Sequence, residues 1–162
     1  MNIEQYIEIR RNIPLDEISF GYQTVRLFPV EELEEAQVGY SVDPSGAKLT
    51  GDDEGDWKYS WLVIGYEELC GDPFFVDLNE KELPVFTAAH GEGAWNPLLI
   101  ASSFIGFIEC LNEIRRISNG RDNPVSLEKN PLPEVEQNQV LSKISELNGN
   151  ASLEFWESWF EV

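Results

Sequence analysis

Apolar and polar residues alternate most clearly in the middle of the chain. Aromatic or apolar side chains occupy every second position from 57 to 63, a period typical of a β-strand. Two further apolar segments follow after short polar connections, at 74–78 and 83–88. Short links between strands favour antiparallel pairing. The pattern therefore predicts a three-stranded antiparallel meander over residues 57–88.

The clearest helix follows this meander. Its apolar positions recur at the spacing of one helical face: Phe104, Phe107, Ile108, Leu111 and Ile114. Ser102 is the predicted N-cap, and Asn119-Gly120 are typical of a helix end. We expect this helix to lie on one face of the sheet and close the core. That arrangement defines an α+β domain.

Weaker patterns flank these elements. At the N-terminal end, residues 1–12 have helical spacing before Pro14, 24–28 read as a strand, and Pro29 with the following glutamates favours a helix start. Three prolines make 122–133 read as an extended connector.

Two further helices are predicted beyond the connector. One covers about 140–147, and a last aromatic helix is capped by Ser152. We treat residues 1–162 as a single domain with a C-terminal helical extension over 122–162. The aromatic tail either docks on the domain or contacts a partner.

The net charge of the chain limits which partners it can bind. Eleven Lys and Arg face 30 Asp and Glu among 162 residues, a net charge of −19. A surface this negative repels phosphate backbones and acidic membranes, so we expect neither as a partner. The longest apolar stretch, 96–108, is interrupted by Pro, Ser and Gly, and the N-terminus lacks the pattern of a signal peptide. We expect a soluble, cytoplasmic protein.

Few side chains are available for catalysis. His90 is the sole histidine, and no Gly-x-Ser-x-Gly motif accompanies it. His90-Gly91-Glu92 matches half of a zinc deaminase signature, whose Pro-Cys-x-x-Cys half is absent. Cys70 and Cys110 form no Cys-x-x-Cys pair and favour two reduced, largely packed thiols. We therefore predict no catalytic residue, metal or cofactor, and a role in ordering its loop for His90.

An acidic loop is the candidate partner-binding segment. Its residues 52–56 do not have the spacing of a calcium-binding EF-hand loop. A cluster of carboxylates beside a rigid sheet suits a basic protein partner and accelerates encounter. The predicted contact residues are Asp52, Asp53, Glu54 and Asp56, with Glu67 and Glu68 as neighbours.

Short motifs around the meander resemble the SUKH superfamily, which contains the fungal killer-toxin-resistance and cell-wall-assembly regulator and many bacterial immunity proteins. In order they are Trp-Leu-Val-Ile-Gly at 61–65, Gly-Asp-Pro-Phe-Phe-Val-Asp at 71–77, Pro-Val-Phe at 84–86, His90-Gly91, and Ile-Ala-Ser-Ser-Phe-Ile-Gly-Phe at 100–107. The matching core covers about 57–111, with a weaker echo at 28–33.

The motif residues have structural roles in this interpretation: Gly65, Gly71, Asp72, His90, Phe104 and Phe107. The glycines permit tight turns, Asp72 accepts backbone N–H groups in its own turn, and the phenylalanines fill the core against the sheet. The C-terminal extension departs from the family pattern.

The resemblance implies a cytoplasmic immunity protein that neutralises the toxic domain of a polymorphic or contact-dependent toxin. Such toxin domains are often nucleases, which are basic where they bind nucleic acid. The alternatives are a regulatory or scaffold protein of the same fold without a toxin partner and, less favoured, a hydrolase or metalloenzyme that uses His90, Glu92 and Asp72. The oligomeric state is not predicted.

Overall fold

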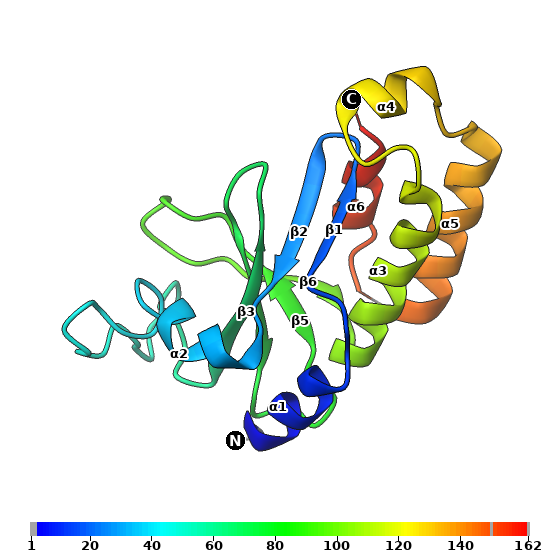
Figure 1. Ribbon diagram of the computed structural model, residues 1–162. Coiled ribbons are helices and arrows are strands. Elements are labelled where there is room, and N and C mark those ends of the chain that lie inside the picture. The colour runs from blue at the N-terminus through cyan, green and yellow to red at the C-terminus, as the bar shows by residue number, and fades with distance from the viewer. Residues whose placement is uncertain (1–2, 150, 162) are drawn as a thin grey trace.

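Six strands form one antiparallel sheet in the computed structural model, which describes residues 3–149 and 151–161 (Figure 1). The strands are β1 (Glu17–Phe20), β2 (Gln23–Leu27), β3 (Trp61–Glu67), β4 (Pro73–Asp77), β5 (Val85–Thr87) and β6 (Leu98–Ala101). They lie in chain order across the sheet, and each pairs antiparallel with the next. The predicted α+β class is confirmed. The meander predicted over 57–88 is the middle of a longer one, but its first strand begins at Trp61 and not at residue 57.

The longest helices cover one face of this sheet. The helices are α1 (Ile3–Arg11), α2 (Leu33–Ala36), α3 (Phe104–Ser118), α4 (Pro124–Lys129), α5 (Glu134–Asn148) and α6 (Glu154–Glu157), with 3₁₀ turns at Val30–Glu32 and Ser158–Phe160. Figure 1 shows α3 and α5 side by side on one side of the sheet, whereas irregular segments project from the other. Within the described residues, none of these helices has the length and apolar character that crossing a membrane requires.

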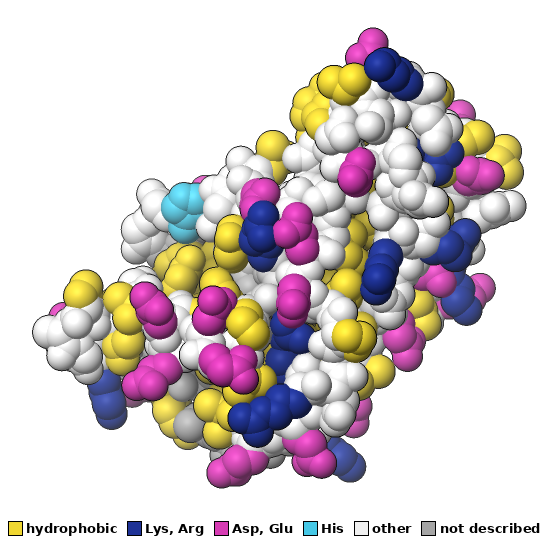
Figure 2. Space-filling view, viewed as in Figure 1, with side chains coloured by type: hydrophobic (Ala, Val, Ile, Leu, Met, Phe, Trp, Pro, Cys, Tyr) yellow, Lys and Arg dark blue, Asp and Glu magenta, His cyan; other side chains and the backbone are white. Residues whose placement is uncertain are grey.

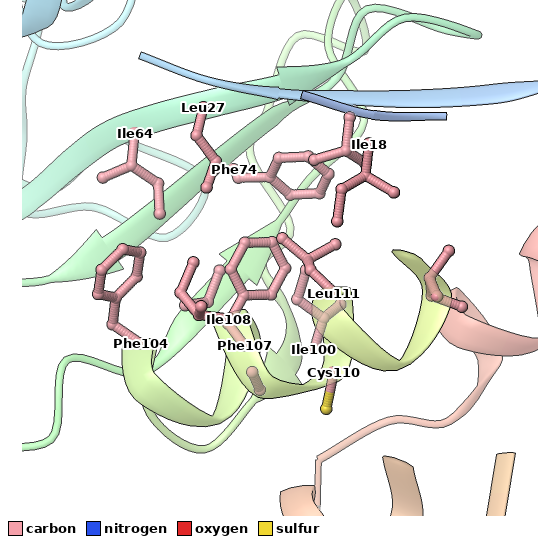
Figure 3. Packing of buried hydrophobic residues seen from close by; sticks show 14 of the residues in the cluster. Ile18, Leu27, Ile64, Phe74, Ile100, Phe104, Phe107, Ile108, Cys110 and Leu111 are labelled. Carbon is pink, nitrogen blue, oxygen red and sulfur yellow. The ribbon is translucent and has the colours of Figure 1, made fainter. Parts of the chain in front are cut away.

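The main core lies between the sheet and α3. Figure 3 shows Leu27, Ile64 and Phe74 pointing from the strands toward Phe104 and Phe107 on the helix. Both helix phenylalanines are fully buried, and the rings of Phe74 and Phe107 are 5.5 Å apart between centroids. The predicted packing of Phe104 and Phe107 against the sheet is confirmed.

The two edge strands were not predicted. Ile18 and Phe20 alternate inward along β1, but four residues are too short for a clear period. Gly21, at φ +57°, begins the tight hairpin turn into β2. β6 is equally short, and its four apolar residues before Ser102 and Ser103 do not alternate with polar ones. The pairing with β5 identifies this segment as a strand.

The N-cap of α3 is Ser103, and the prediction of Ser102 is wrong. Ser103 Oγ accepts a hydrogen bond from the N–H of Gly106 at 2.9 Å. Ser102 Oγ instead donates to the carbonyl of Asn148 at 2.6 Å, at the end of α5. A rule based on sequence cannot distinguish two adjacent serines as caps. The direction in which the chain leaves β6 determines which of them begins the helix.

The predicted extended connector over 122–133 is also wrong, because it contains α4. Asn123 caps this helix by accepting from the N–H of Ser126 at 2.9 Å, and Pro124 occupies the first helical position. Pro133 directly precedes α5. Proline has no N–H to lose in a first turn, so these prolines begin helices.

The aromatic tail docks on the domain. Phe155, Trp156 and Trp159 are buried in the main core. The indole N–H of Trp156 donates to the carbonyl of Ile100 at 2.8 Å, and the side-chain amide of Asn148 donates to the same oxygen at 2.9 Å. These contacts satisfy the Ile100 carbonyl of the edge strand β6, so the C-terminal segment covers this edge of the sheet.

Candidate functional site

A second apolar cluster covers the sheet face opposite α3. Its buried members are Trp57, Val63, Phe75 and Ala88, and half-buried Phe28, Tyr40, Trp61, Phe86 and Trp95 pack against them. Odd-numbered residues of β3 up to the bulge point to this face because side chains alternate along a strand. Two irregular segments, 37–60 and 88–97, cover the cluster. We call this surface and its covering segments the loop face.

Trp57 lies at the centre of this cluster and is only 2% exposed. Its ring centroid is 4.6 Å from that of Phe75, 5.1 Å from Tyr40, 5.2 Å from Trp61 and 5.2 Å from Trp95. The indole N–H of Trp57 donates to the carbonyl of Trp61 at 3.3 Å. The surrounding rings therefore have a fixed base and keep their outer edges accessible.

Gln37 attaches the first covering segment to the sheet. Its side-chain amide donates to the carbonyl of Val63 and accepts from the Val63 N–H, both at 2.9 Å. Val63 borders the irregularity in the β3–β4 pairing. The Gln37 side chain thus satisfies both backbone polar groups of Val63 where the β3–β4 hydrogen bonding is irregular. No local pattern in the sequence indicated this role.

The acidic loop is ordered by its own backbone. Gly51 N–H donates to the carbonyl of Trp57 at 3.1 Å, and the carboxylate of Asp56 accepts from the N–H of Asp53 at 3.0 Å. The N–H of Trp95 donates to the carbonyl of Gly55 at 2.8 Å. Local propensity predicted no order here. The contact with the second covering segment joins this loop to the aromatic cluster.

The four predicted contact residues of this loop differ in accessibility. Asp52, Asp53 and Glu54 are exposed, whereas Asp56 is half-buried because its carboxylate closes the turn. Figure 2 shows acidic side chains next to hydrophobic ones on the side of the molecule that carries α2 and the loops. Three carboxylates therefore remain available to a partner beside the aromatic rings.

Glu67 and Glu68 do not belong to this group. The acidic loop precedes β3, whereas Glu67 is its last residue and Glu68 follows it, and seven strand residues span roughly 20 Å. Glu67 is 6% exposed, so the prediction that it contacts a partner is wrong. Glu68 is exposed but forms an ion pair with Arg26, which also binds Glu17 at 2.6 Å.

Glu67 instead organises the β3–β4 turn. One of its carboxylate oxygens accepts from the N–H groups of Cys70 and Asp72, both at 3.0 Å. The side-chain amide of Gln23 donates to the other oxygen at 3.3 Å. Gly71 has φ +80°, which only glycine adopts at little cost. The acceptor that we predicted at Asp72 is therefore Glu67.

Asp72 makes a longer connection, to His90. Its Oδ1 lies 2.7 Å from His90 Nδ1 and accepts the backbone N–H of His90 at 3.1 Å. The His90 side chain is 52% exposed and that of Asp72 is 25% exposed. The pair fixes the start of the covering segment that carries Trp95. The predicted loop-ordering role of His90 agrees with this geometry.

The charges of this turn act on its neighbours. The carboxylates of Glu67 and, less strongly, Asp72 raise the pKa of the exposed Cys70 thiol, with burial as a further cause. Burial and then Asp72 raise the pKa of Tyr40. Cys70 is therefore a protonated thiol at neutral pH and a poor nucleophile. The prediction of two packed thiols is wrong for Cys70, which is exposed. Cys110 is buried in α3, as predicted.

The metalloenzyme alternative used Asp72, His90 and Glu92. Among the described residues, Glu92 does not join the other two in a group whose ligand atoms could share one ion. The group that meets that distance is Glu67, Cys70 and Asp72, within 4.8 Å. Glu67 already accepts three donors there. The turn is accounted for by its own hydrogen bonds.

Comparisons with known proteins do not assign the chain to a family. No family model matches it, no curated protein matches it in sequence, and no solved structure matches it significantly.

Proposed function

We propose that this protein is a non-enzymatic binding module that neutralises a toxin domain by covering it with the loop face. The observation that carries the proposal is the contact between the acidic loop and the aromatic cluster, through Gly55 and Trp95. It combines accessible carboxylates and partly exposed indole rings on one surface. Catalytic groups are not needed for such a role.

The aromatic rim suits protein recognition. Tyr40, Trp61 and Trp95 are half-buried and rest on fully packed Trp57. Tryptophan and tyrosine are the residue types most often found among the energetically dominant contacts of interfaces. Rings that are already fixed lose little conformational freedom when a partner binds. The rim therefore favours a protein ligand.

Charge favours a basic partner. Residues 37–97 contain 12 acidic and 3 basic residues, a net charge of −9 in little more than a third of the chain. Complementary charge accelerates encounter and restricts the choice of partner. A toxin domain that binds nucleic acid presents a basic surface. The resemblance to the SUKH superfamily points to the same class of partner.

The alternative is a regulatory or scaffold protein of the same fold without a toxin partner. It would use the same surface, so the two proposals differ in the partner and not in the site. Co-expression with the toxin encoded beside its gene separates them. The immunity proposal predicts a stable complex and protection of the cell. Neither complex nor protection would contradict it.

The acidic loop can be tested with a charge-matched pair of variants. Asp52→Asn/Asp53→Asn/Glu54→Gln removes three exposed charges of the loop face. The expected effect is an association rate about tenfold slower at low salt, with a weaker salt dependence. The control, Glu128→Gln/Glu134→Gln/Glu154→Gln, removes three exposed charges from helices and should leave the rate nearly unchanged. Equal slowing in both would contradict a specific role for the loop.

The aromatic rim requires a separate variant. Trp95→Ala should weaken the complex by about thirtyfold, which corresponds to roughly 2 kcal/mol for a central aromatic contact. Ile105→Ala removes an exposed apolar side chain from α3, away from the loop face, and serves as the control. Circular dichroism of both variants establishes that they are folded. Unchanged affinity of folded Trp95→Ala would exclude the rim.

A further inference from the structure

A hollow of about 380 Å³ lies at the β5–β6 end of the sheet. Its apolar wall is formed by Pro84, Phe86 and Leu99. Phe86 and Leu99 are register partners, so both side chains lie on the same sheet face. Phe86 also stacks on Phe75, with 5.7 Å between ring centroids and 20° between planes. The hollow is therefore continuous with the aromatic cluster of the loop face.

The rim of the hollow is acidic. Asp77 at the end of β4 and Glu80 and Glu82 in the following turn contribute three carboxylates, and Lys81 contributes one positive charge. None of these four side chains forms an ion pair with another described residue. Asp77 accepts the N–H of Asn79 at 2.9 Å and so also shapes the turn. The uncompensated local charge is −2.

We propose that this hollow receives an arginine or lysine side chain of the partner protein. The inference rests on the proposed function and adds to it the chemistry of one contact. Lysine and arginine carry an aliphatic stem and a charged head, and they bury the stem along apolar surface while the head stays at a polar rim. The aliphatic stem would pack against Phe86, Leu99 and Pro84. The charged head would bind the carboxylates of Glu80 and Glu82.

The hollow is large enough to receive a long side chain. Its volume lies at the lower end of the roughly 300 to 1,000 Å³ that pockets for drug-sized ligands occupy. A neutral apolar side chain would leave the rim carboxylates without a partner. An acidic side chain would be repelled by the rim. A cation of the partner's surface satisfies both the wall and the rim.

A small cation tests this contact without any toxin. Titration of the ¹⁵N-labelled protein with n-butylguanidinium chloride should shift the amide signals of Phe86 and Leu99 in a saturable manner. Its neutral isostere n-butylurea has the same stem without the charge, and it should bind about threefold to tenfold more weakly. Equal binding of the two probes would overturn the proposal in favour of an apolar occupant.

A matched pair of variants locates the charge. Glu80→Gln/Glu82→Gln should weaken butylguanidinium binding about threefold to tenfold, because both side chains are exposed and the backbone contacts of the turn are kept. Glu134→Gln/Glu154→Gln on the helices should have no effect. Shifts spread over the whole acidic surface, or equal effects of the two variants, would refute a defined site.

The outcome is distinguishable from failure of the proposed function. If Glu80→Gln/Glu82→Gln binds the toxin as tightly as the original protein, the contact is wrong while the function stands. If the probe binds in the hollow but the toxin forms no complex, the function is wrong and the hollow is still a cation site. The probe titration and the toxin assay therefore give independent answers.

Discussion

Replacement of Gly65 by alanine tests whether a close approach between backbones determines this position. Gly65 is buried within β3, opposite Leu27 of β2, at the irregularity after Val63, so its predicted role in a tight turn is wrong. A Cβ atom there would lie 2.2 Å from the backbone oxygen of Arg26, about 1.2 Å short of the 3.4 Å at which ordinary contact begins. Because the nearest atom belongs to the backbone, side-chain rotation cannot relieve the clash.

The expected cost follows from this geometry. Overpacking a tight site costs about 1–3 kcal/mol, and displacing the neighbouring strand weakens ladder hydrogen bonds worth about 1 kcal/mol each. The adjacent bond from Phe28 N–H to the Ile64 carbonyl, at 2.9 Å, is the most directly affected. We expect Gly65→Ala to lower the free energy of unfolding by about 3 kcal/mol. For a chain of this size, that corresponds to roughly 10 °C in Tm.

Gly46→Ala provides the comparison. Gly46 has φ +87° and no atom within 4 Å of the added Cβ, so only the backbone conformation is penalised, by about 1 kcal/mol. Urea unfolding followed by tryptophan fluorescence measures both variants against the original protein. If Gly65→Ala is no less stable than Gly46→Ala, the steric explanation is refuted. A folded Gly65→Ala protein should still bind the partner, because the residue is buried.

Three further predictions concern α3 and the cysteines. Ser103→Ala removes the cap to Gly106 and should cost about 1 kcal/mol in chemical unfolding, whereas Ser103→Thr should restore most of it. Burial raises the pKa of Cys110 to about 12, so the folded protein keeps a proton that the unfolded chain loses above about pH 8.5. Stability should therefore fall above that pH by up to about 1.4 kcal/mol per unit, and Cys110→Ala should remove this share of the slope. Iodoacetamide should modify Cys70 in the native protein more slowly than a peptide thiol, because Glu67 raises the Cys70 pKa. It should modify buried Cys110 only after unfolding. Mass spectrometry after each reaction time distinguishes the two sites.

Local pattern was sufficient for the elements with a clear period. The helical spacing from Phe104 to Ile114 gave α3 and its buried face. The alternation located β3, although its first residues, 57–60, precede the strand. Both signals arise because one side of each element is buried against the same core. The four-residue strands β1 and β6 are too short to carry such a period.

Parts of the candidate site depended on contacts that are distant in sequence. The acidic loop was recognised from composition, but its link to Trp95 crosses 40 residues, from Gly55. Glu67 and Glu68 are adjacent in sequence, yet Glu67 is buried under three donors whereas Glu68 faces solvent beside Arg26. Composition cannot separate two such carboxylates, because their difference arises from the direction in which each side chain leaves the strand.

The sequence by itself determined the α+β class, the negative charge and the scarcity of catalytic groups, because these follow from short-range periodicity and residue counts. The tertiary structure alone decided that the aromatic tail covers the sheet edge and that segments 37–60 and 88–97 meet over its other face. The physical reason is that the hydrophobic effect favours burial of an apolar surface by any segment, whatever its position in the sequence. Which segments cover a surface is fixed only when all of them compete for it in three dimensions.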